Sequence, residues 1–320
     1  MKNRLGYIDI LKGILIILVV VGHSDIGEGT RLAIYSFHMP LFFILNGFLY
    51  SHKKIGFRNF TIKRIKRLLV PYVCFFLLNC IIQLNFSPKH ILRFIFGGRM
   101  IEGVYWFIPV LFMSQIALYF IVEHLGRKGM VITFVLLYSA AMVESYLPIK
   151  NVKIPLDADV VFLAVPYMLI GFILNDAIRK YIIEEEKKKS LLLVSISVLF
   201  SFVMMFLIYT ERISYVFDMK YVSYAYPVLN LIIPLVMGIV ILKLSVFMER
   251  IKLVSNAISL IGLASMTVMY LNISLLALLD KFIDIEIFNT TLVLLVSVVF
   301  YKVCTTNKAL SLLFNGQKKL

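Results

Sequence analysis

Residues 8–24 read IDILKGILIILVVVGHS, an almost unbroken apolar segment whose ionisable side chains are Asp9, Lys12 and His23. A helix of roughly 20 mostly apolar residues is long enough to cross a lipid bilayer. Asp9 and Lys12 interrupt the early part of the segment, so we expect it to be retained as a first span and not cleaved as a signal peptide. The segment therefore predicts a membrane protein with ionisable groups inside its first helix.

The composition of the whole chain also indicates a membrane protein. Of its 320 residues, 61% are hydrophobic and 16% are charged, and the mean hydropathy is +0.92. A soluble domain has about 25% charged and about 45–50% apolar residues, so lipid must cover much of this surface. The net charge of +15 comes without a nucleic-acid-binding motif, and the three cysteines show no metal-binding spacing. We expect neither a nucleic-acid partner nor a metal ion.

Further apolar segments follow along the chain and predict an all-α, polytopic integral membrane protein with about ten transmembrane helices. We expect them to form a single membrane-embedded domain over residues 1–320, because no connection is long enough for a soluble domain. The predicted spans are residues 8–24, 32–50, 68–86, 105–123, 130–147, 158–175, 190–209, 225–247, 257–279 and 288–306.

The distribution of basic residues predicts the orientation in the membrane. Of the 33 Lys and Arg residues, 23 lie on the side of the N-terminus, 9 lie in the alternate connections, and Lys12 lies within a span. Cytoplasmic connections of membrane proteins have an excess of Lys and Arg. We therefore expect both termini in the cytoplasm, which agrees with an even number of spans.

Lys12 and His23 are predicted to lie on one face of the first helix. They are eleven residues apart, which is about 20° beyond three full turns and about 16 Å along the helix axis. Asp9 lies one turn before Lys12 and can pair with it. Ionisable groups are costly in hydrocarbon, so all three are functional candidates. The alternative is a lysine that snorkels to the interface and an interfacial histidine.

The second and fourth predicted spans hold further polar or aromatic candidates. His38 lies about 9 Å below the outer surface, close to the depth of His23, so the two histidines can face one another across a site. The alternative is a hydrogen-bonded core histidine. Asn46 is a second polar residue in the same span. Trp106, the only tryptophan, begins the fourth span, where the alternative to substrate contact is an anchor at the membrane interface.

The densest basic stretch of the chain runs from His52 to Arg67. Arg64 and Arg67, at positions i and i+3, share a helix face just before the third span, where both can grip the phosphates of a nucleotide-like cofactor. The alternative is a loop that contacts anionic lipid headgroups.

Four segments in the N-terminal third together resemble the acyltransferase 3 family, the integral-membrane O-acyltransferases of cell-surface glycans. The first helix of the family has a basic residue, ten intervening residues and a histidine, matched here by Lys12 and His23. The R-x-x-R motif of the family is matched by Arg64 and Arg67, and His38 lies in a form of helix two that resembles the fucose 4-O-acetylase branch. The four segments are YIDILKGILIILVVVGHS (7–24), FHMPLFFILNGFLY (37–50), KRIKRLLVPY (63–72) and YWFIPVLF (105–112).

The resemblance covers residues 7–112 well and the remainder of the chain loosely. Two positions depart from the pattern of the family. Asn46 precedes Gly47 where relatives usually have Ser-Gly. Relatives often have a histidine late in the penultimate helices, where this chain has Asn272, so we leave Asn272 out of the catalytic candidates.

The resemblance implies an acyl-CoA donor, most often acetyl-CoA. It implies an envelope or capsular glycan, or a lipid-linked sugar, as acceptor, and a bacterial plasma membrane as location. Lys12, Arg64 and Arg67 are then expected to hold the donor phosphates at the cytoplasmic end. His23 is expected beside the acceptor hydroxyl, as a general base or as the site of an acyl-histidine intermediate, because an imidazole pKa of about 6.5 suits proton transfer at neutral pH.

The other candidates complete this arrangement. His38 is the second catalytic histidine, Asp9 holds Lys12 in place, and Asn46 and Trp106 are assigned to the substrate. Membrane lipids are the remaining expected partners.

Two other functions stay open from the sequence. An exporter or flippase of a polysaccharide or lipid-linked sugar would also line its path with buried charges. A non-enzymatic partner in polysaccharide assembly is a weaker alternative. The enzyme is favoured, because a transporter has no evident need of cytoplasmic phosphate-binding groups joined to a histidine near the outer surface.

Overall fold

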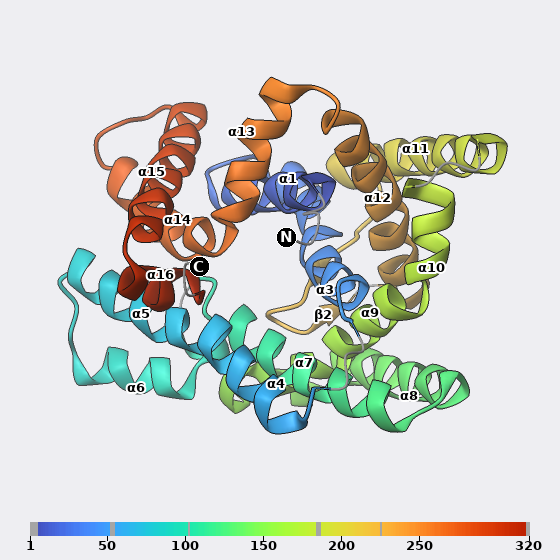
Figure 1. The fold of residues 1–320 in the computed structure, drawn as a ribbon, viewed down its shortest axis with the longest axis horizontal. Helices are drawn as coiled ribbons and strands as arrows, with labels where there is room; N and C mark the ends of the chain where they lie inside the picture. The colour runs from blue at the N-terminus through green and yellow to red at the C-terminus, as the bar shows by residue number, and fades with distance from the viewer. Residues whose placement is uncertain (1–5, 52–54, 102, 184–186, 225, 318–320) are drawn as a thin grey trace.

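The computed structural model describes residues 6–51, 55–101, 103–183, 187–224 and 226–317, which form a helical bundle with one short hairpin (Figure 1). The helices of the first half are α1 (Gly6–His23), α2 (Glu28–Tyr35), α3 (His38–Phe48), α4 (Phe57–Arg64), α5 (Val70–Ile82), α6 (Pro88–Phe96), α7 (Phe107–His124) and α8 (Arg127–Tyr146). Those of the second half are α9 (Val161–Ile173), α10 (Asn175–Ile178), α11 (Lys187–Tyr209), α12 (Pro227–Met248), α13 (Lys252–Leu263), α14 (Ser265–Leu279), α15 (Glu286–Thr306) and α16 (Lys308–Asn315).

Shorter elements connect these helices. Two are π-helical, η1 (Ile65–Leu69) and η5 (Arg179–Ile183), and three are 3₁₀ turns, η2 (Gly98–Met100), η3 (Pro148–Asn151) and η4 (Pro155–Val160). The strands β1 (Phe217–Asp218) and β2 (Ser223–Tyr224) form an antiparallel hairpin. In the view of Figure 1, α1 and α3 lie near the centre of the bundle, between α14–α16 on one side and α9–α12 on the other.

Eight helical stretches in the described ranges are long and apolar enough to cross a membrane, and α13 with α14 gives a ninth if this bent pair is one span. The predicted all-α, polytopic architecture is therefore confirmed, with two-residue strands as its β structure in those ranges. The eight stretches are α1, Phe57–Ile82, α7, α8, Pro155–Ile173, Ser190–Tyr209, α12 and α15.

The second predicted span, residues 32–50, is divided between α2 and α3, and each of these helices is too short to span the membrane alone. The break lies at Ser36 and Phe37. Pro40 has no backbone N–H, so a continuous helix would leave the carbonyl of Ser36 without its partner. A new helix that begins at His38 places Pro40 in its first turn, where no such bond is needed.

Two glycines allow α1 and α13 to pack with their backbones in contact. A Cβ atom on Gly13 would lie 2.2 Å from the carbonyl oxygen of Ile258, and one on Gly262 would lie 1.8 Å from that of Asp9. One residue after Gly262, α13 ends, and α14 leaves at an angle of 75° within the predicted span 257–279. The close packing therefore places this bend beside the first half of α1.

A second glycine pair joins α3 to α9. A Cβ atom on Gly47 would lie 1.8 Å from the carbonyl oxygen of Met168, and one on Gly171 would lie 1.9 Å from that of Ile44. Contact between the two backbones holds the short helix α3 inside the bundle. It fixes the position of the polar residues along α3.

The β1–β2 hairpin is packed against the bundle through its side chains. Phe217 pairs with Tyr224, and both are 2% exposed, as is Met219 in the turn between them. Ser145 of α8 donates its hydroxyl to the carbonyl of Tyr224 and accepts from its N–H. The hairpin is thus anchored to α8 at its base.

A buried ion cluster fixes the segment that leads into α7. The Arg99 backbone N–H and side-chain Nε both donate to Asp157 Oδ1, at 3.0 Å and 3.1 Å, and the guanidinium also pairs with Asp159. Gly98, with φ +58°, leaves no room for a Cβ beside the Asp157 carboxylate. This contact fixes η2 against η4.

Candidate active site

A cavity of about 1050 Å³ lies between α1, α3, η1, α7, the β1–β2 hairpin and the bend between α13 and α14. Pockets for small molecules measure about 300–1,000 Å³, so this one is large enough for an extended ligand. Its wall includes all the site residues predicted from the sequence, namely Asp9, Lys12, His23, His38, Asn46, Arg64, Arg67 and Trp106.

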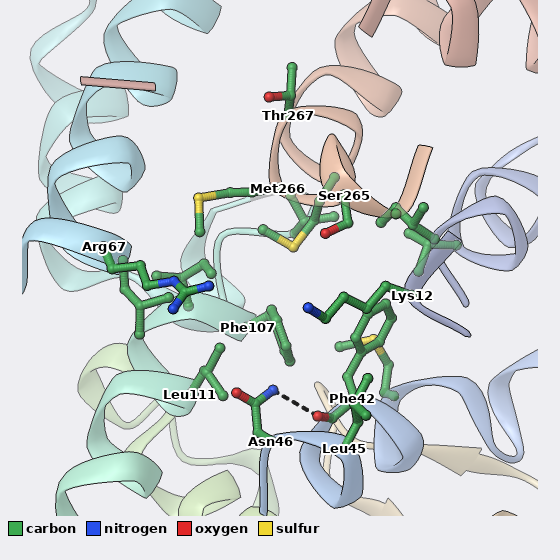
Figure 2. A pocket seen from close by; sticks show the side chains of 18 of the residues that line it. Lys12, Phe42, Leu45, Asn46, Arg67, Phe107, Leu111, Ser265, Met266 and Thr267 are labelled. Carbon is green, nitrogen blue, oxygen red and sulfur yellow. Dashed lines mark hydrogen bonds between the residues drawn. The ribbon is translucent and has the colours of Figure 1, made fainter. Parts of the chain in front are cut away.

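Helix α1 forms one wall of the cavity along much of its length. Lys12 Nζ lies 3.8 Å from Asp9 Oδ1, the pairing expected from their spacing of one turn. His23 borders the same cavity at the other end of α1. The prediction from the helix period that Lys12 and His23 share one face of α1 therefore agrees with the structure. Lys12 points into the cavity and not into lipid (Figure 2).

Tyr35 contacts the rings of both histidines. Its ring centroid is 6.4 Å from that of His23 and 5.2 Å from that of His38. Both histidines line the same cavity, and their placement opposite one another across a site stays a prediction. Tyr35 itself lines the cavity. It was not predicted from the sequence, because it is the last residue of α2 and the sequence pattern did not separate α2 from α3.

The two histidines differ in their hydrogen bonding. His38 Nδ1 lies 2.8 Å from the carbonyl oxygen of Ile34. A carbonyl oxygen only accepts, so Nδ1 holds a proton and Nε2 is the acceptor in the neutral imidazole. His38 is 4% exposed. His23 is exposed at the cavity wall and makes no hydrogen bond within the described part of the chain.

The two arginines occupy different environments, although both line the cavity. The Arg64 guanidinium lies 4.9 Å from the ring centroid of Phe60, a cation–π contact. Arg67 lies one turn later, within the π-helical segment η1, and points toward Lys12 from the opposite wall (Figure 2). π-Helical segments widen a turn and are frequent at functional sites.

A second cavity of about 810 Å³ adjoins the first at its basic end. Lys12, Lys63 and Arg67 line both cavities, and Lys66 lines the second. Four cationic side chains thus surround this opening. His52, at the start of the basic stretch, lies outside the described residues.

The amide of Asn46 is bonded on both sides by the protein. Its Nδ2 donates to the carbonyl of Phe42 at 2.8 Å (Figure 2), and its Oδ1 accepts from Gln115 Nε2 at 3.0 Å. Gln115 of α7 is 4% exposed. Asn46 therefore joins α3 to α7 at the cavity wall, and its amide is largely committed to that contact.

Trp106 is 7% exposed and lines the cavity at the start of α7. A tryptophan of an aromatic belt faces the lipid interface. The ring of Trp106 is therefore buried at the cavity wall, and its contact with a substrate stays a prediction.

Two groups of cavity residues lie outside the segments that the sequence singled out. Ser265, Met266 and Thr267 line the cavity where α14 begins (Figure 2). The tip of the β1–β2 hairpin contributes a second group, Asp218, Met219, Lys220 and Tyr221. The sequence signal for the hairpin is a group of polar residues between two apolar spans. This signal predicts a connection, but it does not predict that the connection lines the cavity.

Asn272, left out of the catalytic candidates, is absent from the residues that line the cavity in the described structure. It is fully buried in α14, and its Nδ2 donates to the carbonyls of Val268 and Met269 in its own helix. These contacts give it a role within the helix.

The sequence matches an acyltransferase 3 family model, described as an acyltransferase domain, over residues 5–305. The nodulation protein NolL of Sinorhizobium fredii (strain NBRC 101917 / NGR234) is 29% identical over 216 residues, which cover 61% of this chain and 55% of that protein. NolL of Mesorhizobium japonicum (strain LMG 29417 / CECT 9101 / MAFF 303099) is 33% identical over 132 residues, 36% of this chain and 35% of that protein.

The chain therefore spans about half the length of the first relative and about a third of the second in these matches. No solved structure matches the chain. The family match extends far beyond the four N-terminal segments and includes both positions that depart from the usual pattern, Asn46 and Asn272. The resemblance inferred from the sequence is confirmed, and the chain belongs to the acyltransferase 3 family of membrane acyltransferases.

Proposed function

We propose that this protein is a multi-pass O-acyltransferase of a bacterial plasma membrane, and specifically an O-acetyltransferase. It moves the acyl group of an acyl-CoA to a hydroxyl of an envelope or capsular glycan, within a single membrane domain whose termini are both cytoplasmic. One observation supports this function best. A single cavity is lined by cationic side chains at one end and by His23 about 16 Å further along α1.

The cationic end suits the phosphates of the donor. Lys12 and Arg67 point into the cavity from opposite walls (Figure 2). Lys63 and Lys66 line the adjoining second cavity. Charge-assisted hydrogen bonds to phosphate are about twice as strong as neutral ones. A polyanionic nucleotide held here would extend its long, thin acyl-bearing arm along α1 toward His23.

His23 is placed to act on the acceptor. Its imidazole takes the proton of the sugar hydroxyl while the hydroxyl oxygen attacks the thioester carbonyl. The tetrahedral intermediate then collapses, the carbon–sulfur bond breaks, and the CoA thiolate leaves and takes up a proton. A two-step route, in which His23 first accepts the acyl group and then passes it to the sugar, uses the same geometry.

His38 and Asp9 have supporting roles in this proposal. The bond from His38 Nδ1 to Ile34 leaves Nε2 as a proton acceptor, and the ring of Tyr35 contacts those of both histidines. Asp9 pairs with Lys12 and fixes its position. Trp106 and Asn46 line the same cavity and are assigned to the substrate.

The experiment is transfer by the purified protein in lipid nanodiscs. Acetyl-CoA with a labelled acetyl group is supplied together with methyl glycosides or isolated surface glycan, and mass spectrometry detects the new ester. Surface glycans from cells with and without the gene provide the second measurement. Absence of ester formation, combined with unchanged esters in cells without the gene, would overturn the proposal. Sugar movement across the membrane without esterification would favour the exporter.

A further inference from the structure

The tip of the β1–β2 hairpin forms the cavity wall at the histidine end. Asp218, Lys220 and Tyr221 all line the cavity there. Lys220 lies within electrostatic reach of His23, and Asp218 lies within reach of Tyr35. These side chains therefore surround the place where an acceptor must enter, and the four N-terminal family motifs do not include them.

The hairpin tip is held rigidly by its neighbours. Asp218 Oδ1 accepts from the backbone N–H groups of Lys220 and Tyr221, at 2.8 Å and 3.3 Å, which closes the turn. Lys220 Nζ contacts the carbonyl oxygens of Ile101 and Gly103, at 3.5 Å and 3.4 Å, on the segment that leads to Trp106. A rigid element is a suitable place for a binding group, because little ordering is needed when the ligand arrives.

The Asp218 carboxylate has unused hydrogen-bonding capacity. Both of its hydrogen bonds in the described structure are to Oδ1, so Oδ2 is left to accept from a ligand. Burial raises the pKa of Asp218, although the two N–H groups and the Lys220 charge oppose this rise. A buried carboxylate gains stability when a hydroxyl donates to it, because the bond offsets the loss of hydration.

Aromatic residues line the same cavity as this carboxylate. Tyr221 adjoins Asp218 at the hairpin tip and is 56% exposed, Tyr35 contacts both histidine rings, and Trp106 also lines the cavity. A pyranose presents hydroxyl donors at its edge and apolar C–H groups on its faces. A carboxylate beside aromatic faces matches both parts of such a ring.

We infer that the hairpin tip is the acceptor subsite, where the Asp218 carboxylate accepts a hydrogen bond from a sugar hydroxyl and Tyr221 packs against the sugar ring. Lys220 positions the tip through its contacts with residues 101 and 103. This inference rests on the proposed function. It assigns sugar recognition to the hairpin and leaves the chemistry to α1.

The variant that tests it is Asp218→Asn. Asparagine keeps a side-chain oxygen that accepts from the two turn N–H groups, so the hairpin retains its closure while the carboxylate charge is lost. Asp284→Asn is the matched control, because Asp284 is an exposed aspartate that does not line the cavity in the described structure. Tyr221→Ala is the second test variant, with the exposed Phe282→Ala as its control.

Two measurements separate this inference from the proposed function. Binding of methyl glycosides is measured by saturation-transfer NMR without a donor, and transfer from acetyl-CoA is measured at varied glycoside concentration. We expect Asp218→Asn to weaken glycoside affinity and raise the acceptor KM by about tenfold to hundredfold. The donor KM should stay unchanged, and both controls should match the natural sequence.

The outcomes are distinct. Acceptor affinity and KM within twofold of the natural sequence in both Asp218→Asn and Tyr221→Ala would overturn the inference while the proposed function stands. Glycoside binding that depends on Asp218, in a protein that forms no ester, would overturn the proposed function and leave the sugar subsite in place. Absence of any glycoside binding by the natural sequence would overturn the subsite.

Discussion

Lys12 on α1 and Arg67 on η1 point toward one another across the same cavity (Figure 2). Two like charges converge there, and each is separated from the other by open space. A polyanion between them would relieve their repulsion and bond to both. The donor site that we propose is therefore formed jointly by two helical segments that are far apart in sequence.

Removal of either charge should weaken donor binding. Arg67→Ala and Lys12→Ala are each expected to cost about 1.5–3 kcal/mol, which is about tenfold to hundredfold in acyl-CoA affinity. Lys12→Arg should retain more affinity than Lys12→Ala, since it keeps a positive charge beside Asp9. Titration of acyl-CoA in nanodiscs checks this, with the exposed Arg127→Ala as control. Unchanged acyl-CoA affinity in both alanine variants would contradict donor binding and would favour contact of these basic residues with anionic lipid headgroups.

Arg64→Ala is expected to have a smaller effect than Arg67→Ala in the same titration. The Arg64 guanidinium is engaged by the Phe60 ring, whereas Arg67 projects into the open cavity. An equal or larger loss for Arg64→Ala would contradict this difference.

His23→Ala should abolish transfer and leave acyl-CoA binding largely intact, because it removes a proton acceptor and not a phosphate contact. General base catalysis contributes about 10²–10⁴-fold, so the loss in kcat is easy to measure. His38→Ala should lose less, since His38 is 4% exposed and its Nδ1 is engaged by the carbonyl of Ile34. An equal loss in both variants would indicate a two-histidine site. A near-normal transfer rate in His23→Ala would contradict the proposed role of His23 as general base or acyl carrier.

Gly262→Ala should destabilise the fold. Its Cβ would lie 1.8 Å from the carbonyl oxygen of Asp9, so α1 and α13 would have to separate. Overpacking of this kind costs about 1–3 kcal/mol. Thermal unfolding in detergent measures the loss against Gly126→Ala, where a Cβ meets nothing within 4 Å. Equal melting temperatures for the two variants would show that the helices adjust freely.

Arg99→Ala should be more destabilising than a surface arginine change. It leaves the carboxylates of Asp157 and Asp159, each with 1% side-chain exposure, without their partner. Breaking a buried pair by removal of one member costs about 3–5 kcal/mol. Arg93→Ala on the exposed face of α6 is the control, and detergent unfolding is the measurement. A loss no greater than that of Arg93→Ala would contradict this view of the cluster.

The orientation is tested by cysteine labelling from each side of the membrane. Asn151 in η3 and Lys308 in α16 are exposed and are predicted to lie outside and inside, respectively. The native Cys80 and Cys304 are 1% and 2% exposed, but Cys74 is half-buried, so labelling of the natural sequence is measured as the background. Asn151→Cys should react with an impermeant maleimide in intact cells, and Lys308→Cys only after permeabilisation. The reverse pattern would mean that the membrane orientation is inverted.

The sequence by itself determined the class of protein and the face of α1. Apolar length predicts spans because lipid offers backbone groups no hydrogen-bond partner. The helix period placed Lys12 and His23 on one face and Asp9 beside Lys12, since these relations depend only on rise and turn per residue. The break between α2 and α3 within residues 32–50 also has a local cause, Pro40. A prediction based only on the number of consecutive apolar residues does not detect it.

The tertiary structure alone decided how the elements meet. Tyr35 contacts the rings of both histidines, Arg67 faces Lys12, and the hairpin tip with Asp218 lines the histidine end of the cavity. Each relation joins residues on different elements, and it depends on backbone contacts such as that between Gly262 and α1. Helix period relates residues within one element only. The distance between two elements follows from the packing of the whole bundle, which no local pattern specifies.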